Sequence, residues 1–281
     1  MPGLPPIATL HLFPKLDTAL LELLGSLPES AWQKPTIAGN WTIKDIVAHL
    51  LDGNLRTLSM LKDGYFGEKP ENVEQYSDLV AFLNQLNADW TRAMRRLSPR
   101  ILTEWLALSG KEAYEFLATL PPNEKAVFSV AWAGEEHSPN WFHVAREYTE
   151  KWHHQQQIRL ALAQTAPLYQ RAFYFPYLRV SMRALPHHYR LVKAERGDTI
   201  QISVNGDSGG HWWLTFLGRH WELAEEENIG HKVVCQVIIP PEIAWRLLTR
   251  GITTEEARPQ IEIKGKTTLG EPIFLARAVM V

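Results

Sequence analysis

The hydrophobic pattern of this chain changes its period partway along, and that change restricts the fold more than any other feature. Up to about residue 165, apolar residues recur every three or four positions, which is typical of helices that pack through one face. From Gly197 the pattern alternates, because polar residues separate Ile200, Ile202 and Val204, which is typical of a strand with one buried face. We therefore expect two domains, a helical one over residues 1–167 and a small α+β one over residues 168–281.

The first domain is expected to be a helical bundle. Thr42 and Asp45 fit a capping box, in which each side chain binds a backbone N–H group at the start of a helix. Ser98-Pro99 and Ser138-Pro139 are further start signals, since Ser can cap a helix and Pro suits its first turn. Helices are predicted over residues 17–27, 43–62, 72–97, 99–120 and 140–164, with an extended segment over 126–134. Long amphipathic helices with short connections favour a bundle.

The second domain is expected to combine strands with short helices. Residues 169–185 continue the helical pattern and could belong to either domain. Strands are predicted around 200–204, 212–217, 233–237 and 260–264. Helices are predicted over Pro241–Arg250, which Gly251 would end, and after a capping box of Thr253 and Glu256. Large apolar side chains here either line a pocket between helix and sheet or fill the core: Trp212 or Trp213, Phe216, Trp245 and Leu248.

Composition and charge exclude several classes of protein. The 281 residues carry a formal net charge of −2 without a run of Lys or Arg, so neither nucleic acid nor an anionic membrane is expected as a partner. No apolar run approaches the roughly 20 residues of a membrane span, and the N-terminus lacks the pattern of a signal peptide. The single cysteine, Cys235, cannot form an intrachain disulfide. We expect a cytoplasmic protein that acts on a small molecule.

A row of polar residues follows one face of the helix predicted over 140–164. The row comprises His143, Glu147, Glu150 and His154, and residues four apart lie only about 40° apart around a helix. Glu150 and His154 could therefore bind one metal ion together. The spacing alone also fits an ordinary ion pair on an exposed face, because an acidic residue four positions before a histidine occurs elsewhere in the chain, for example at Asp207 and His211.

A third candidate lies on the helix that Thr42 and Asp45 begin. His49 stands beside the apolar stripe of that helix, and Gly53, one turn later, would leave room for an incoming group. The alternative is a histidine at the edge of the bundle. For Asp45 we prefer the capping role to a metal role.

These residues resemble a known family. The segment W-T-I-K-D-I-V-A-H-L at 41–50, followed by R-E-Y-T-E-K-W-H-H-Q-Q-Q-I-R at 146–159, is similar to the DinB superfamily and more narrowly to the mycothiol-dependent maleylpyruvate isomerase type. The resemblance covers roughly residues 15–165. It implies a four-helix bundle, here with an extra helical stretch at about 98–120, followed by a sterol-carrier-like α+β domain. It also implies that His49, Glu150 and His154 bind a divalent metal ion.

The chemistry of these ligands suggests an enzyme. Two imidazoles and a carboxylate suit a catalytic zinc ion, although nickel, manganese or iron would also fit. Cys235 is predicted on a strand of the other domain, so a thiol in the reaction must come from a small cosubstrate. His143 or Glu147 could orient a ligand or relay a proton, or both could be solvated, while Trp41 and Trp152 could flank the pocket.

Two interpretations of the function stay open. The first is a metal-dependent enzyme that uses a low-molecular-weight thiol in transfer or isomerisation. The alternative is a metal-binding bundle without catalysis, whose C-terminal domain binds a small apolar ligand or a partner. An open coordination position on the metal favours the enzyme, and a closed or empty site favours the alternative.

Overall fold

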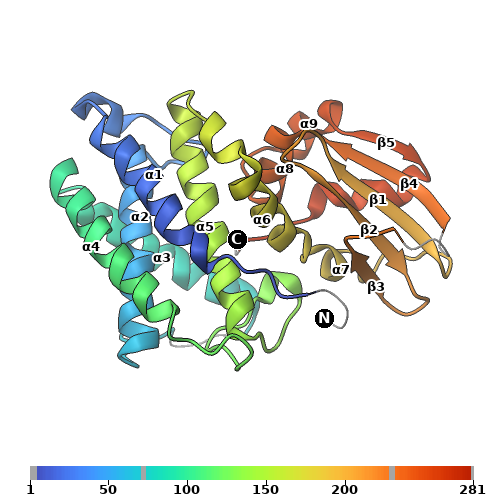
Figure 1. Cartoon of the computed structure of the whole chain (residues 1–281), viewed down its shortest axis with the longest axis horizontal. Coiled ribbons are helices and arrows are strands. Elements are labelled where there is room, and N and C mark those ends of the chain that lie inside the picture. Colours follow the sequence, from blue (N-terminus) through green and yellow to red (C-terminus); the bar gives the residue numbers. More distant parts are fainter. Residues whose placement is uncertain (1–4, 71–73, 228–231, 280–281) are drawn as a thin grey trace.

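The structure is a computed structural model that describes residues 5–70, 74–227 and 232–279. Long helices form its N-terminal part, and a sheet with shorter helices beside it forms its C-terminal part (Figure 1). The long helices are α1 (Phe13–Gly25), α2 (Ile43–Arg56), α3 (Tyr76–Met94), α4 (Pro99–Leu117) and α5 (Asn140–Ala161). The shorter ones are α6 (Arg171–Met182), α7 (Leu185–His188), α8 (Pro241–Leu248), α9 (Thr254–Ala257) and α10 (Thr267–Gly270). None of the helices in these three ranges is both long and apolar enough to cross a membrane.

The predicted helices of the first region are confirmed within a few residues at each end. The capping box of Thr42 and Asp45 begins α2, and the helix continues as a π-helical stretch, Thr57–Lys62, to the predicted end. Ser98 caps α4 as expected, since its hydroxyl accepts a hydrogen bond from the Ile101 N–H group. Of the helix predicted over 72–97, residues 72 and 73 lie outside the described residues. Further 3-10 turns occur at Leu10–Leu12, Glu29–Gln33, Ala131–Ala133, Ala166–Tyr169, Arg258–Gln260 and Glu271–Leu275.

The bundle consists of α1, α2, α4 and α5, and α3 is the additional helix. Leucines of α1 and α4 pack with Ile46 of α2 and Ile158 of α5 in one core. Helix α3 lies against α2, where the Trp90 indole N–H group donates to the carbonyl of Ala48. Just after α3, Arg95 forms an ion pair with Asp45, at 2.9 Å. The helical stretch at about 98–120, which the sequence left without a place in the bundle, is therefore α4, and it supplies a wall of the core.

The segment 126–134 is a loop, so the predicted extended segment is wrong. Its backbone makes local contacts instead of pairing with a strand: the N–H group of Ala126 binds the carbonyl of Ser138. The Ser138 hydroxyl accepts from the Val130 N–H group, which leaves Pro139, not Ser138, at the N-cap of α5. The loop then turns at Gly134, whose φ of 78° is in the left-handed region that glycine adopts readily.

The described part of the C-terminal region contains a mixed five-stranded sheet in the order β3-β2-β1-β4-β5. The strands are β1 (Asp198–Val204), β2 (Gly210–Phe216), β3 (Trp221–Ala224), β4 (Lys232–Ile239) and β5 (Glu262–Gly265). β1 and β4 are parallel and the other pairs are antiparallel. The sequence analysis missed β3, because four residues are too few to show alternation. The helix end predicted at Gly251 also differs, since α8 ends at Leu248 and Arg250 takes the positive φ of 56°.

One face of the sheet is buried beneath α6 and α8, which lie between the sheet and the bundle (Figure 1). Trp212, Trp245 and Leu248 are buried, so the prediction that they fill the core is confirmed. Trp213 neighbours Trp212 in β2 and is turned to the other face of the sheet. The core beneath the sheet also includes residues of α5, so it does not divide the chain at one point. The domain boundary predicted between residues 167 and 168 therefore stays a prediction.

Trp152 links α5 to the C-terminal region. Its ring stacks on Tyr177, with centroids 4.1 Å apart, and on Tyr174, at 5.1 Å, both from α6. It also meets Trp245 of α8 edge to face, at 6.0 Å. The side chain is completely buried, so this aromatic cluster holds the helix that carries Glu150 and His154 against the second half of the chain.

Replacing Trp152 with Ala should lower the free energy of unfolding by about 3–5 kcal/mol, because it leaves a large cavity in this core. Denaturant unfolding followed by circular dichroism measures the change. Trp105 of α4, which is 47% exposed, provides the control, and its replacement with Ala should cost about 1 kcal/mol or less. Equal effects of the two substitutions would contradict the conclusion that Trp152 packs in the core between α5 and the C-terminal region.

Candidate metal site

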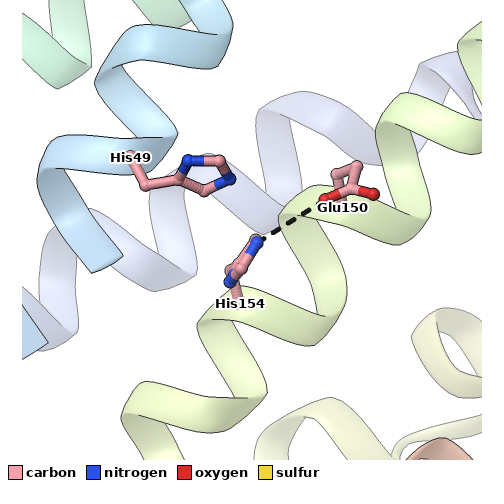
Figure 2. A group of neighbouring side chains, drawn as sticks. All are labelled: His49, Glu150 and His154. Carbon is pink, nitrogen blue, oxygen red and sulfur yellow. Dashed lines mark ion pairs between the residues drawn. The ribbon is translucent and has the colours of Figure 1, made fainter. Parts of the chain in front are cut away.

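His49, Glu150 and His154 meet between α2 and α5. One donor atom from each side chain lies within 4.8 Å of the donor atoms of the other two. Figure 2 shows the imidazole of His49 turned from α2 toward Glu150 and His154, which lie one turn apart on α5. The Nε2 atom of His154 lies 3.5 Å from Glu150 Oε2. These residues, called the triad below, are the ones that the sequence analysis predicts as metal ligands, and the structure brings them together.

Local structure places each member of the triad. On α2, the Asp45 carboxylate accepts hydrogen bonds from the backbone N–H group and the hydroxyl of Thr42, which fixes the first turn and confirms the capping role of Asp45. Trp41 directly precedes this cap, and its ring lies 4.9 Å from that of His49 and 6.2 Å from that of His154. The cap therefore positions both the histidine and the indole that covers it.

A hydrogen bond selects the tautomer of His154. The Nδ1 atom lies 2.9 Å from Gln157 Oε1, which can only accept, so Nδ1 carries the proton and donates it. The lone pair then belongs to Nε2, the atom that faces Glu150. This pattern is typical of metal-binding histidines, whose second nitrogen usually donates to a neighbouring acceptor.

The surroundings keep the donors of the triad in the forms that bind metals. Burial lowers the pKa of His49 well below its usual range, and the nearby His154 lowers it further, so the imidazole is neutral at pH 7. Burial raises the pKa of Glu150, but the neighbouring His153, His154 and Arg146 side chains act in the opposite direction and lower that pKa overall. A neutral imidazole and an ionised carboxylate both offer lone pairs to a cation.

The donor set also passes a test of fit for a metal ion. His49 Nδ1 is buried and makes no hydrogen bond to any described residue. No hydrogen bond from this nitrogen therefore explains why the ring faces Glu150 and His154. Glu150 is half-buried, and the ring centroids of His49 and His154 are only 4.7 Å apart. Converging imidazoles that share no hydrogen bond, beside a carboxylate, are the donor set that a divalent ion such as zinc accepts.

The other predicted site residues lie at different distances from the triad. Trp41 contacts it, whereas Trp152 points into the core on another side of α5. Glu147 lies one turn before Glu150 and pairs with Arg146, and the same guanidinium lies 3.2 Å from Nδ1 of His143. Arg146 thus contacts both His143 and Glu147, the two residues that were considered for a proton relay.

Two residues near the triad were missed by the sequence analysis. Gln157 follows His154 by three positions on the same helical face, and this spacing could have identified it. His153 lies with its ring 4.0 Å from that of His154, and its Nδ1 atom donates to the carbonyl of Thr149. Burial and the nearby His154 lower the pKa of His153 to about 4, so this ring is neutral at pH 7.

Comparisons with known proteins agree with this architecture. The family model described as the mycothiol maleylpyruvate isomerase N-terminal domain matches residues 13–159. Two solved structures of the mycothiol-dependent maleylpyruvate isomerase, one a histidine-to-alanine mutant, are similar, with TM-scores of 0.54 and 0.53 and 11% sequence identity. The mutant alignment covers 93% of each chain, and the other covers 87% of this chain and 88% of that one. At this identity the likeness shows a shared fold over both halves.

Two further comparisons add little. A structure described as the UbiJ-SCP2 ubiquinone synthesis protein aligns with 41% of this chain and 91% of its own, at 18% identity and a TM-score of 0.23. The sterol-carrier-like character of the C-terminal region stays a prediction. A search of curated proteins gives no match.

Acidification should destabilise the protein through His143. Burial lowers its pKa to about 4, although the charge of Glu147 opposes this, while an unfolded histidine titrates near 6.5. Between these values the unfolded chain binds a proton that the folded chain does not. The free energy of unfolding should therefore fall as the pH drops from about 6.5 to 4, by about 1–3 kcal/mol for this residue, and then level off.

Denaturant unfolding across that pH range measures the effect. His143→Asn should reduce the slope, and the same change at the exposed His220 controls for the substitution itself. An unchanged slope in His143→Asn would show that His143 takes up its proton in the folded state.

Proposed function

The chain belongs to the family defined by the mycothiol maleylpyruvate isomerase N-terminal domain, and on that premise we propose that it is a metal-dependent enzyme that uses a small thiol in isomerisation or group transfer. The observation that carries this proposal is the convergence of His49, Glu150 and His154, whose donor atoms lie within 4.8 Å of one another. Three protein ligands would leave room for a further ligand on the ion, as catalytic sites require.

The donor set supports a divalent metal ion, and we propose zinc. Two imidazoles with one carboxylate are typical of catalytic zinc sites, and nickel, manganese or iron bind the same donors. When bound, such an ion supplies Lewis acidity, which lowers the pKa of a thiol or water that it contacts. The protein's own residues supply orientation: Gln157 holds His154 with its Nε2 lone pair toward Glu150, and Trp41 covers both imidazoles on one side.

The thiol must come from outside the chain. Cys235 is the single cysteine, it is 1% exposed, and it lies on β4 rather than near the triad. Burial raises the pKa of this thiol to about 11, so it is protonated and unreactive at neutral pH. The relatives with solved structures are described as mycothiol-dependent, and this supports a low-molecular-weight thiol as cosubstrate here.

Protein purified without a metal-affinity tag should contain about one divalent metal ion per chain, measured by elemental analysis. Replacing His49, Glu150 or His154 singly with Ala should sharply reduce the metal content, because each removes one of three ligands. The fold, followed by circular dichroism, should survive. His220→Ala and Glu226→Ala, two exposed positions, serve as controls. Full metal retention in all three triad variants would refute the site.

Substitution with cobalt tests whether the ion has an open position and accepts a thiol. The visible spectrum of the cobalt protein should change when a small thiol is added, because thiolate ligation alters the ligand field. A panel of thiols at millimolar concentrations covers different substituents. A spectrum that stays constant throughout would count against the thiol reaction and favour the alternative, a metal-binding bundle without catalysis.

A further inference from the structure

Helix α2 is buried on almost every side except along one line of residues that begins at His49. Between Ile43 and Thr57, only the exposed Leu55 and three partly accessible residues, His49, Gly53 and Arg56, escape burial. The three partly accessible residues are spaced by four and three positions, so they share one face of the helix. We call them the open stripe.

The open stripe runs beside the accessible side of α5. Trp41, before the start of α2, contacts His154, and His49 farther along faces Glu150 as well, so the two helices run in opposite directions. Residues that follow His49 therefore lie alongside residues that precede Glu150. Arg146, Glu147 and Glu150 are partly accessible on α5, while most of its other residues are buried. The open stripe thus leads away from the triad along a side that solvent reaches.

Gly53 stands at the centre of the open stripe without a structural reason to be glycine. Its φ is not positive, and a Cβ atom built there meets no heavy atom within 4 Å. At Gly110 and Gly251, by contrast, packing explains the glycine: a Cβ on Gly110 would come within 3.2 Å of the Asp17 carboxylate, and one on Gly251 within 2.7 Å of Ile37. Glycine is also one of the least favourable residues inside a helix, so at Gly53 it sacrifices stability and leaves space one turn from His49.

We propose that this space receives the body of the small molecule that binds at the triad, and that the missing side chain of Gly53 sets how bulky that molecule can be. The inference rests on the metal site proposed above. The ligand class is a small molecule that reaches the ion through one donor atom, a thiol in the proposed reaction, with its remaining atoms across Gly53. Arg56, one turn after Gly53 on the same stripe, has its Nε 3.0 Å from Asp52 Oδ2.

The test uses the full chain loaded with cobalt and two probes that bind metals through the same ring nitrogen, imidazole and phenylimidazole. Binding is followed by the visible spectrum. In Gly53→Leu, the affinity for phenylimidazole should fall by about tenfold or more, while that for imidazole stays within about twofold, because only the larger probe extends over residue 53. Gly53→Ala should give a smaller loss of the same kind. Both variants should melt at a higher temperature than the parent protein, since Ala and Leu favour helix.

Gly25 provides the matched control. It ends α1, is exposed, and a Cβ atom there likewise meets nothing within 4 Å, so Gly25→Leu should leave both affinities unchanged. Unchanged phenylimidazole binding in Gly53→Leu would overturn the proposal. Equal weakening of both probes would also overturn it, because that result indicates a distorted metal site.

The outcomes separate this proposal from the proposed function. A parent protein that takes up no cobalt would refute the metal site and the role of Gly53 with it. A parent protein that binds both imidazoles but responds to no thiol would refute the thiol reaction alone, and the comparison of the two probes would still decide the role of Gly53.

Discussion

The structure depends on a polar helix that is buried between two hydrophobic cores. On one side α5 contributes Ile158 to the core of the bundle, and on another it contributes Trp152 to the core shared with α6 and α8. Yet most of its buried residues between Trp152 and Arg159 are polar. Burying a polar group is costly unless it finds a partner, so α5 can occupy this position only because most of its side chains are satisfied internally.

Those internal contacts explain why the candidate site lies where it does. Arg159 donates to the carbonyl of Ala19, Lys151 pairs with Asp17, and His154 donates to Gln157. At the triad this pattern changes, because the imidazole and carboxylate groups of α2 and α5 converge while His49 Nδ1 has no partner among the described residues. Elsewhere on α5 the polar groups stabilise the fold, whereas these groups form the donor set for which we propose a cation.

The same arrangement ties the two halves of the chain together. Glu150 and His154 flank Trp152 in sequence but lie on a different side of the helix. The helix that carries these proposed ligands therefore packs, through Trp152, against the aromatic cluster of the C-terminal region. The fold shared with the two solved isomerases extends over both halves, consistent with a C-terminal region that is part of one framework. Gly53 is the opposite case, because glycine is unfavourable inside a helix and we propose that the space it leaves receives part of a small molecule.

The sequence by itself determined the features that depend on neighbouring residues. The capping boxes at Thr42 and Thr253, the helix starts and the shared face of Glu150 and His154 are local, because hydrogen bonds within one turn and the helical period produce them. Only tertiary structure decided which parts of the chain meet. It brings His49 beside Glu150, which the family resemblance but not the spacing suggested. It also places α3 outside the bundle, and Trp152 in a core rather than a pocket. Periodicity shows that a helical face is buried but not which element covers it. In the same way, the apolar residues at 126–134 did not show that the segment forms a loop instead of a strand.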